Sequence, residues 1–158
     1  MFGVEEIVST ENEANLIEIP EIWQKAKKDG TIDRIAAMAG VKYDDASKGI
    51  KPVNAVMCYR DTGIGSFPYM LFAFTPEGGV EDGFVRVDIP TLAWAIFTCD
   101  EHAADKTTEV IQALWKRIYS EWFPTSTYEH DTGPEFEMYG VYENGKEYCE
   151  VWIPVKKK

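Results

Sequence analysis

The sequence is poor in the residues that build metal and redox sites. It has two histidines and three cysteines among 158 residues, and Cys58, Cys99 and Cys149 form no C-x-x-C pair. Zinc sites and Cys/His nucleophile pairs need these residues at characteristic spacings, which are absent. We therefore expect no metal site, and three reduced thiols in a cytoplasmic protein.

Motifs for nucleotide binding and for common hydrolases are also missing. The glycines form no G-x-G-x-x-G or P-loop pattern, and neither G-x-S-x-G nor H-E-x-x-H occurs. No apolar run reaches the roughly 18 residues of a membrane helix. The first ten residues lack the basic region and cleavage site of a secretory signal. We expect a protein with no cofactor, no membrane span and no leader.

Positive charge is scarce. Sixteen lysines and arginines face 27 aspartates and glutamates, for a net charge of −11. Phosphate backbones and anionic membrane surfaces repel such a chain, so we expect no direct nucleic-acid binding by this segment and no membrane association. Cationic small molecules would be attracted, although many proteins are acidic for solubility alone.

The composition is that of one globular domain. Apolar residues make up 45% of the chain and charged residues 27%, close to globular averages. A chain of 158 residues has the size of a single domain with a real core, so we expect one domain over residues 1–158.

Periodicity and turn residues predict the secondary structure. Strands are expected over residues 1–10, 52–59, 67–74, 83–87, 92–98, 135–142 and 148–155. Helices are expected over residues 20–28, 31–39 and 107–123, with a loop at 41–51. Pro20 is expected in the first turn of its helix and Pro124 is expected to end the last helix.

The element order repeats along the chain. Strand, helix, strand, strand occurs twice, and Ile22-Trp23-Gln24-Lys25 in one helix faintly echoes Leu114-Trp115-Lys116-Arg117 in another. This order predicts an α+β fold in which two pseudo-symmetric units, about residues 1–80 and 81–158, share a mostly antiparallel sheet. The helices are expected to pack on one face of that sheet.

Alternation in the last hairpin suggests a site. Carboxylates and aromatic rings are expected to share one face: Glu135, Glu137, Tyr139, Tyr148, Glu150 and Trp152. The apolar residues are expected to pack on the helices: Phe136, Met138, Val151 and Ile153. Carboxylates flanked by rings bind organic cations, but an ordinary solvated sheet face would produce the same pattern.

Several stretches together resemble the GyrI-like, AraC-type effector-binding domain. They cover nearly the whole chain and are most specific near its C-terminal end. They are Ile19-Pro20-Glu21-Ile22-Trp23, Phe67-Pro68-Tyr69, Gly83-Phe84 through Ile89-Pro90, Ala93-Trp94-Ala95-Ile96-Phe97, Trp122 through Tyr128, Gly133 through Tyr139, and Glu150 through Val155.

The resemblance implies a pseudo-symmetric α+β domain with a ligand cleft between its halves, and diverse ligands that are often lipophilic cations. The family's E-x-Y segment, whose buried glutamate commonly faces the ligand, falls on Glu137 and Tyr139. Tyr69 and Trp94 follow by analogy with aromatic positions of the family. With Trp152 from the hairpin pattern, these five residues form the expected ligand site.

The resemblance leaves several functions open. The first is a small-molecule-binding module without chemistry, either free-standing or the sensor of a transcriptional regulator with a fused DNA-binding domain. The second is a hydrolase of cyclopropanoid toxins with Glu137 as general base. The third is a gyrase-inhibitor-like module that binds a protein partner through its acidic surface.

Overall fold

The computed structural model describes residues 1–41 and 49–158, so part of the expected loop, 42–48, lies outside the described residues. The strands are β1 (Phe2–Ser9), β2 (Gly49–Ile50), β3 (Asn54–Met57), β4 (Ser66–Ala73), β5 (Val85–Arg86), β6 (Trp94–Thr98), β7 (Tyr128–His130), β8 (Glu135–Val141) and β9 (Glu147–Lys157). The helices are α1 (Asn15–Lys28), α2 (Thr31–Met38), α3 (Thr107–Arg117) and α4 (Phe123–Thr125), with short turns η1 (Glu11–Glu13) and η3 (Ala104–Lys106) and a π-helical segment η4 (Ile118–Trp122).

The strands form one antiparallel sheet. Its order is β5-β1-β4-β3-β8-β9-β6, with β2 paired to β8 and β7 paired to β9. Each of these described pairs is antiparallel. The predicted α+β class with a mostly antiparallel sheet is confirmed.

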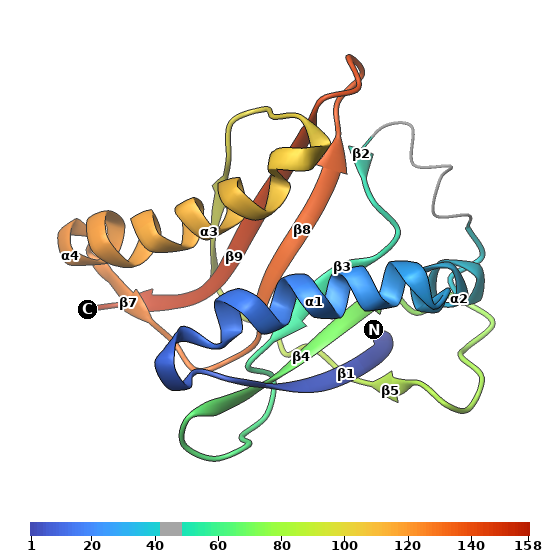
Figure 1. Ribbon diagram of the computed structural model, residues 1–158. Helices are drawn as coiled ribbons and strands as arrows, with labels where there is room; N and C mark the ends of the chain where they lie inside the picture. The colour runs from blue at the N-terminus through green and yellow to red at the C-terminus, as the bar shows by residue number, and fades with distance from the viewer. Residues whose placement is uncertain (42–48) are drawn as a thin grey trace.

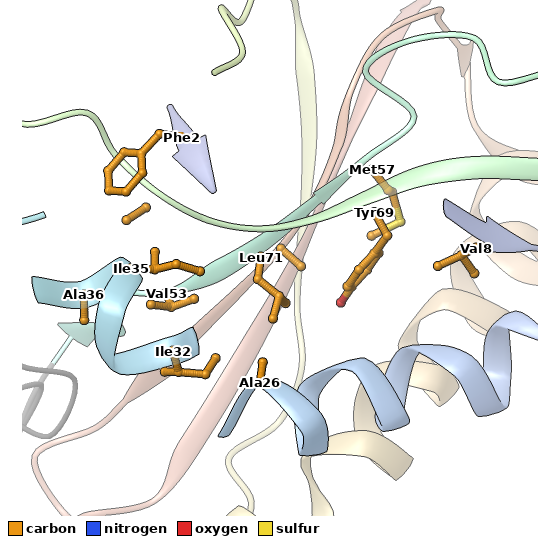
Figure 2. Close-up of a cluster of buried hydrophobic side chains, with 12 residues drawn as sticks. Phe2, Val8, Ala26, Ile32, Ile35, Ala36, Val53, Met57, Tyr69 and Leu71 are labelled. Atoms are coloured by element: carbon orange, nitrogen blue, oxygen red, sulfur yellow. The ribbon is translucent and has the colours of Figure 1, made fainter. Parts of the chain in front are cut away.

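The long helices cover one face of this sheet (Figure 1). α1 and α2 enclose a core cluster with β1, β3 and β4, and Figure 2 shows Tyr69 within it, its hydroxyl pointing away from the sheet toward the helices. α3 encloses a second cluster with β8 and β9. Trp23 of α1 and Trp115 of α3 pack against both clusters, so the two helices meet over the middle of the sheet.

Pro20 lies inside α1 rather than in its first turn, which corrects the prediction. The helix begins at Asn15, five residues before the proline. Proline has no N–H to donate to the carbonyl of Leu16, one turn earlier. The side-chain amide of Gln112 in α3 donates to that carbonyl instead, at 3.1 Å. The carbonyl that lacks a helical partner thus forms a hydrogen bond between α1 and α3.

Pro124 does not end the last helical stretch. α3 passes without interruption into η4 and then α4, which contains Pro124 and ends at Thr125. Pro124 is next to the last residue of this stretch, so its missing N–H removes at most one hydrogen bond at the helix end. None of the helices in the described parts of the chain has the length and apolar composition needed to cross a membrane.

The face assignment predicted for β8 is wrong. Phe136 and Met138 lie in a third cluster with Val56, Met70 and Phe72, on the face away from the helices. Register explains the difference, because Glu137 lies opposite Val151, which belongs to the cluster under α3. For β9 the prediction is confirmed: Val151 and Ile153 pack toward the helices. The carboxylates of β8 are therefore inside the molecule.

Candidate functional site

Glu137 lies at the centre of the sheet beneath the two long helices. Its strand, β8, pairs with β3 on one side and β9 on the other. Ala55 and Val151 are its cross-strand neighbours. The small side chain of Ala55 leaves space on this face, and the neighbouring strand β4 brings Tyr69 over it. Glu137 is only 4% exposed, which is rare for a carboxylate without an ionic partner.

Three neutral donors bind the Glu137 carboxylate. The hydroxyls of Tyr69 and Tyr139 donate to Oε2 at 2.8 and 2.9 Å. The indole Nε1–H of Trp115 donates to Oε1 at 2.7 Å. The carboxylate thereby connects β4, β8 and α3 through charge-assisted hydrogen bonds, the stronger class of hydrogen bond.

Trp23 extends the network to α1. Its indole Nε1–H donates to the Tyr69 hydroxyl at 2.8 Å, and its ring meets that of Tyr139 edge to face at 5.2 Å between centroids. Trp23 and Trp115 are half-buried and come from different helices. Together they cover Glu137 from the side of the helices.

Burial dominates the electrostatics of this network. Desolvation raises the pKa of Glu137, and the hydrogen bonds from Trp115, Tyr69 and Tyr139 oppose the shift. Burial and the nearby carboxylate also raise the pKa of both tyrosines well above 10, so they remain donors. Among the described residues no cation contributes to the pKa of Glu137. The site therefore holds a buried carboxyl group whose hydrogen-bond partners among the described residues are all neutral.

Three of the five predicted site residues are brought together and two are not. Glu137, Tyr139 and Tyr69 form the network. Trp152 lies opposite Phe136 in the β8–β9 pair and so projects to the other face. Trp94 contacts Phe136 on that same face, at 5.3 Å between ring centroids. The sheet itself separates these two tryptophans from Glu137.

Trp23 and Trp115 are the site residues that the sequence reasoning missed. The apolar stripe of its helix makes core packing the simpler interpretation for Trp115, and Trp23 was singled out only by the echo between the two helices. The shared tryptophan of the two echoing helix segments was the available signal. A buried indole still needs an acceptor for its N–H, and a carboxylate in the sheet below supplies one.

The Glu137 carboxylate is covered in this structure, with only 4% of the residue exposed. The two hollows that the structure describes lie over β1 and α1, and residues such as Glu6, Ile22 and Lys25 line both. Glu137 lines neither of them. Trp115 and Trp23 hold hydrogen bonds to Glu137 and to its partner Tyr69 on the side of the helices.

A second buried carboxylate lies beside the first. Glu135, two residues earlier on β8, is 7% exposed. Its Oε1 lies 2.6 Å from His130 Nε2 and 3.4 Å from the hydroxyl of Tyr119. The hydrogen bond to Glu135 raises the pKa of His130. This carboxylate, unlike Glu137, has a titratable cation as its partner.

Comparisons with known proteins identify a family and a shared fold. The family model described as "Cass2: Integron-associated effector binding protein" matches residues 1–155. The structure of SAV2435 bound to tetraphenylphosphonium is similar, with a TM-score of 0.66 and 17% sequence identity over 98% of this chain and 87% of that chain. At this identity the likeness establishes a shared fold. No curated protein matches the sequence.

Proposed function

Because the chain belongs to the family of integron-associated effector-binding proteins, we propose that it binds lipophilic organic cations at Glu137. The family match confirms the resemblance to effector-binding domains that the sequence motifs indicated. One observation carries the proposal: Glu137 is a buried carboxylate whose described partners are all neutral donors.

The physical reason is the cost of the buried charge. A carboxylate taken out of water loses hydration that neutral donors replace only in part. A ligand cation would supply the opposite charge that the described surroundings lack. Indole and phenol rings surround Glu137, and the faces of such rings attract cations. The SAV2435 fold, which this chain shares, was solved with a ligand of this chemistry, tetraphenylphosphonium.

Ligand entry would have to displace a tryptophan. The Trp115 indole donates a hydrogen bond to Oε1 of Glu137, and the Trp23 indole donates one to the hydroxyl of Tyr69. When Trp115 swings away, Oε1 loses its donor and becomes available to the cation. The two helices that carry these indoles would separate as the ligand enters between them.

We propose binding rather than hydrolysis for Glu137. Oε2 already accepts two hydrogen bonds and Oε1 accepts one, which fills most of the acceptor capacity of a carboxylate. A general base needs a free lone pair aimed at a water molecule, whereas in the proposed complex the cation faces the Oε1 atom that Trp115 releases. The protein-binding alternative stays a prediction, which a pull-down at low and high salt would test.

We also propose that the single domain, residues 1–158, consists of two related halves, about 1–80 and 81–158. The element orders β1-α1-β3-β4 and β6-α3-β8-β9 support this. If β1 corresponds to β6, β3 to β8 and β4 to β9, the sheet order β1-β4-β3-β8-β9-β6 is the same read from either end. Superposing the halves of an experimental structure tests it, and unrelated Cα paths would refute it.

The biological role that fits this site is that of an effector sensor in the cytoplasm, free-standing or joined to a DNA-binding domain in a regulator. Three free cysteines suit a reducing compartment. The full reading frame tests the regulator form, since an upstream helix-turn-helix would support it.

The proposed binding has a direct test by calorimetry. Tetraphenylphosphonium and tetraphenylborate have nearly the same shape and opposite charge. We expect the cation to bind at moderate ionic strength and the borate not to bind. Equal affinity for the two ions would show that shape, and not the charge of Glu137, governs recognition.

A further inference from the structure

We propose that Glu135 forms a second cation subsite beside Glu137, so that the preferred ligands are aromatic dications whose positive centres lie about 7 Å apart. This inference rests on the proposed function and assigns its ligand class. Three features of the structure carry it: the spacing of the carboxylates, the rings above them and the partner of Glu135.

The two carboxylates share one face of one strand. Glu135 and Glu137 are two residues apart on β8 and are 7% and 4% exposed. Residues two apart on a strand point to the same face, at a separation of about 7 Å. Both side chains face the helices, where Tyr119 and Trp115 meet them. A ligand held at Glu137 therefore has a second buried carboxylate within reach.

Aromatic rings repeat above the carboxylates at a matching distance. Trp115 donates to Glu137, and Tyr119, one helical turn later, donates to Glu135. The two rings are nearly parallel, with 14° between their planes and 6.2 Å between centroids. Each carboxylate thus has its own ring, and the 6.2 Å between the rings is close to the spacing of about 7 Å between residues two apart on a strand.

His130 indicates which kind of group Glu135 accepts. Its imidazole, an aromatic nitrogen base that becomes a cation on protonation, lies 2.6 Å from Glu135. The same ring lies 6.1 Å from that of Phe123. The His130 side chain is 39% exposed and Tyr119 is 49% exposed, so this end of the site opens toward solvent. The second head group of a ligand would take the place of the imidazole.

Competition with His130 makes the dication preference depend on pH. Besides His130, Glu135 faces Tyr119 of η4, Cys58 after β3 and Glu137 on its own strand. The charges beside His130 are Asp131 and Lys156. The bond to Glu135 raises the pKa of His130. Below that pKa the imidazolium occupies Glu135, and above it the carboxylate lacks a cation, so the preference should grow as pH rises.

Two probes of similar shape, one with a single positive charge and one with two, test for the second subsite. N-methyl-4-phenylpyridinium has one cationic centre, and N,N′-dimethyl-4,4′-bipyridinium has a second at about the required distance. By calorimetry at moderate ionic strength, we expect the dication to bind about tenfold more tightly than the monocation. Glu135→Gln should reduce this preference to a ratio of about one and leave the affinity for the monocation within about twofold of that of the unaltered protein. Glu137→Gln should weaken both probes.

The control is Glu121→Gln, which removes one negative charge from an exposed side chain on η4. It should preserve the dication ratio. If Glu121→Gln lowers the ratio as much as Glu135→Gln does, bulk acidity is the cause and the inference is overturned. Equal binding of both probes to the unaltered protein also overturns it and leaves the proposed function standing. If neither probe nor tetraphenylphosphonium binds, the proposed function fails.

The unaltered protein gives an independent arm that needs no variant to fold. The charges of both probes are constant with pH, and titration of Glu137 affects both alike. We expect the dication ratio to increase between about pH 6 and about pH 8, where histidine titrates. A ratio that is flat or falls over this range overturns the competition with His130 and the subsite with it.

Discussion

Replacing Glu137 by glutamine removes the buried charge with little change of shape. The amide oxygen can still accept from Tyr69 and Tyr139, but the amide N–H2 then faces the indole N–H of Trp115. One unsatisfied donor costs about 1–3 kcal/mol of stability. The variant no longer buries a carboxylate charge, which offsets part of this cost. We expect Glu137→Gln to fold with modestly reduced stability.

The loss of cation affinity follows from Coulomb's law. A cation about 5 Å from the carboxylate, at an effective dielectric constant of about 20, gains about 3 kcal/mol. Desolvation of both charges on binding offsets part of this attraction. We therefore expect Glu137→Gln to weaken tetraphenylphosphonium binding by about 1.4–2.8 kcal/mol, which is roughly ten- to a hundredfold in Kd.

Quenching of tryptophan fluorescence, checked by calorimetry, measures this loss. Triphenylphosphine oxide, a neutral ligand of related shape, should lose less than about twofold in affinity. Because the chain carries a net charge of −11, the titrations are run at moderate salt, which screens surface attraction more than a buried pair. The matched control is Glu121→Gln, which should bind as the unaltered protein does. Equal losses for cationic and neutral ligands, or the same loss in Glu121→Gln, would refute the reasoning.

Four further predictions follow, three from the Glu137 network and one from the β1–β4 strand pair. Burial raises the pKa of Glu137 above its ordinary 4.5, so affinity for tetraphenylphosphonium should rise with pH through that raised pKa, and Glu137→Gln should show no such rise. The effect of Glu137 on stability has the opposite sign, because the folded state keeps the Glu137 proton to higher pH than the unfolded state does. As pH rises from the ordinary pKa of glutamate to the raised pKa, the free energy of unfolding of the unaltered protein should therefore fall relative to that of Glu137→Gln. Tyr69→Phe leaves the Trp23 indole without its acceptor and should cost about 1–3 kcal/mol in urea unfolding; an unchanged midpoint would contradict this. Gly3→Ala would put a Cβ 2.0 Å from the Leu71 carbonyl oxygen. It should destabilise the protein by about 1–3 kcal/mol or more through the β1–β4 pair, measured as a lower Tm. An unchanged Tm would contradict this.

The alternation of β8 separates Glu137 from Phe136, but it does not say which of the two faces the helices. That choice depends on the strand's neighbours, Ala55 and Val151, and therefore on register between distant segments. This is why Trp152 was expected beside Glu137 although the sheet lies between them.

The fold class and the buried glutamate could be predicted because they depend on local patterns and on a resemblance over nearly the whole chain. The position of Pro20 could not, because a proline inside a helix needs a partner for the freed carbonyl. Gln112 supplies that partner from another helix, 96 positions along the sequence from the Leu16 carbonyl. Trp23 and Trp115 were missed for a related reason, since their N–H acceptors lie on strands far away in the sequence.

The most direct test of the Glu137 site uses the five indole N–H groups as reporters. In ¹⁵N-labelled protein titrated with tetraphenylphosphonium, the account predicts large shifts for the indole resonances of Trp23 and Trp115, which lie in the Glu137 network. Trp94 and Trp152, on the far face of the sheet, should shift little. Large shifts of Trp94 and Trp152, with Trp23 and Trp115 unmoved, would place the ligand on the opposite face and contradict the account.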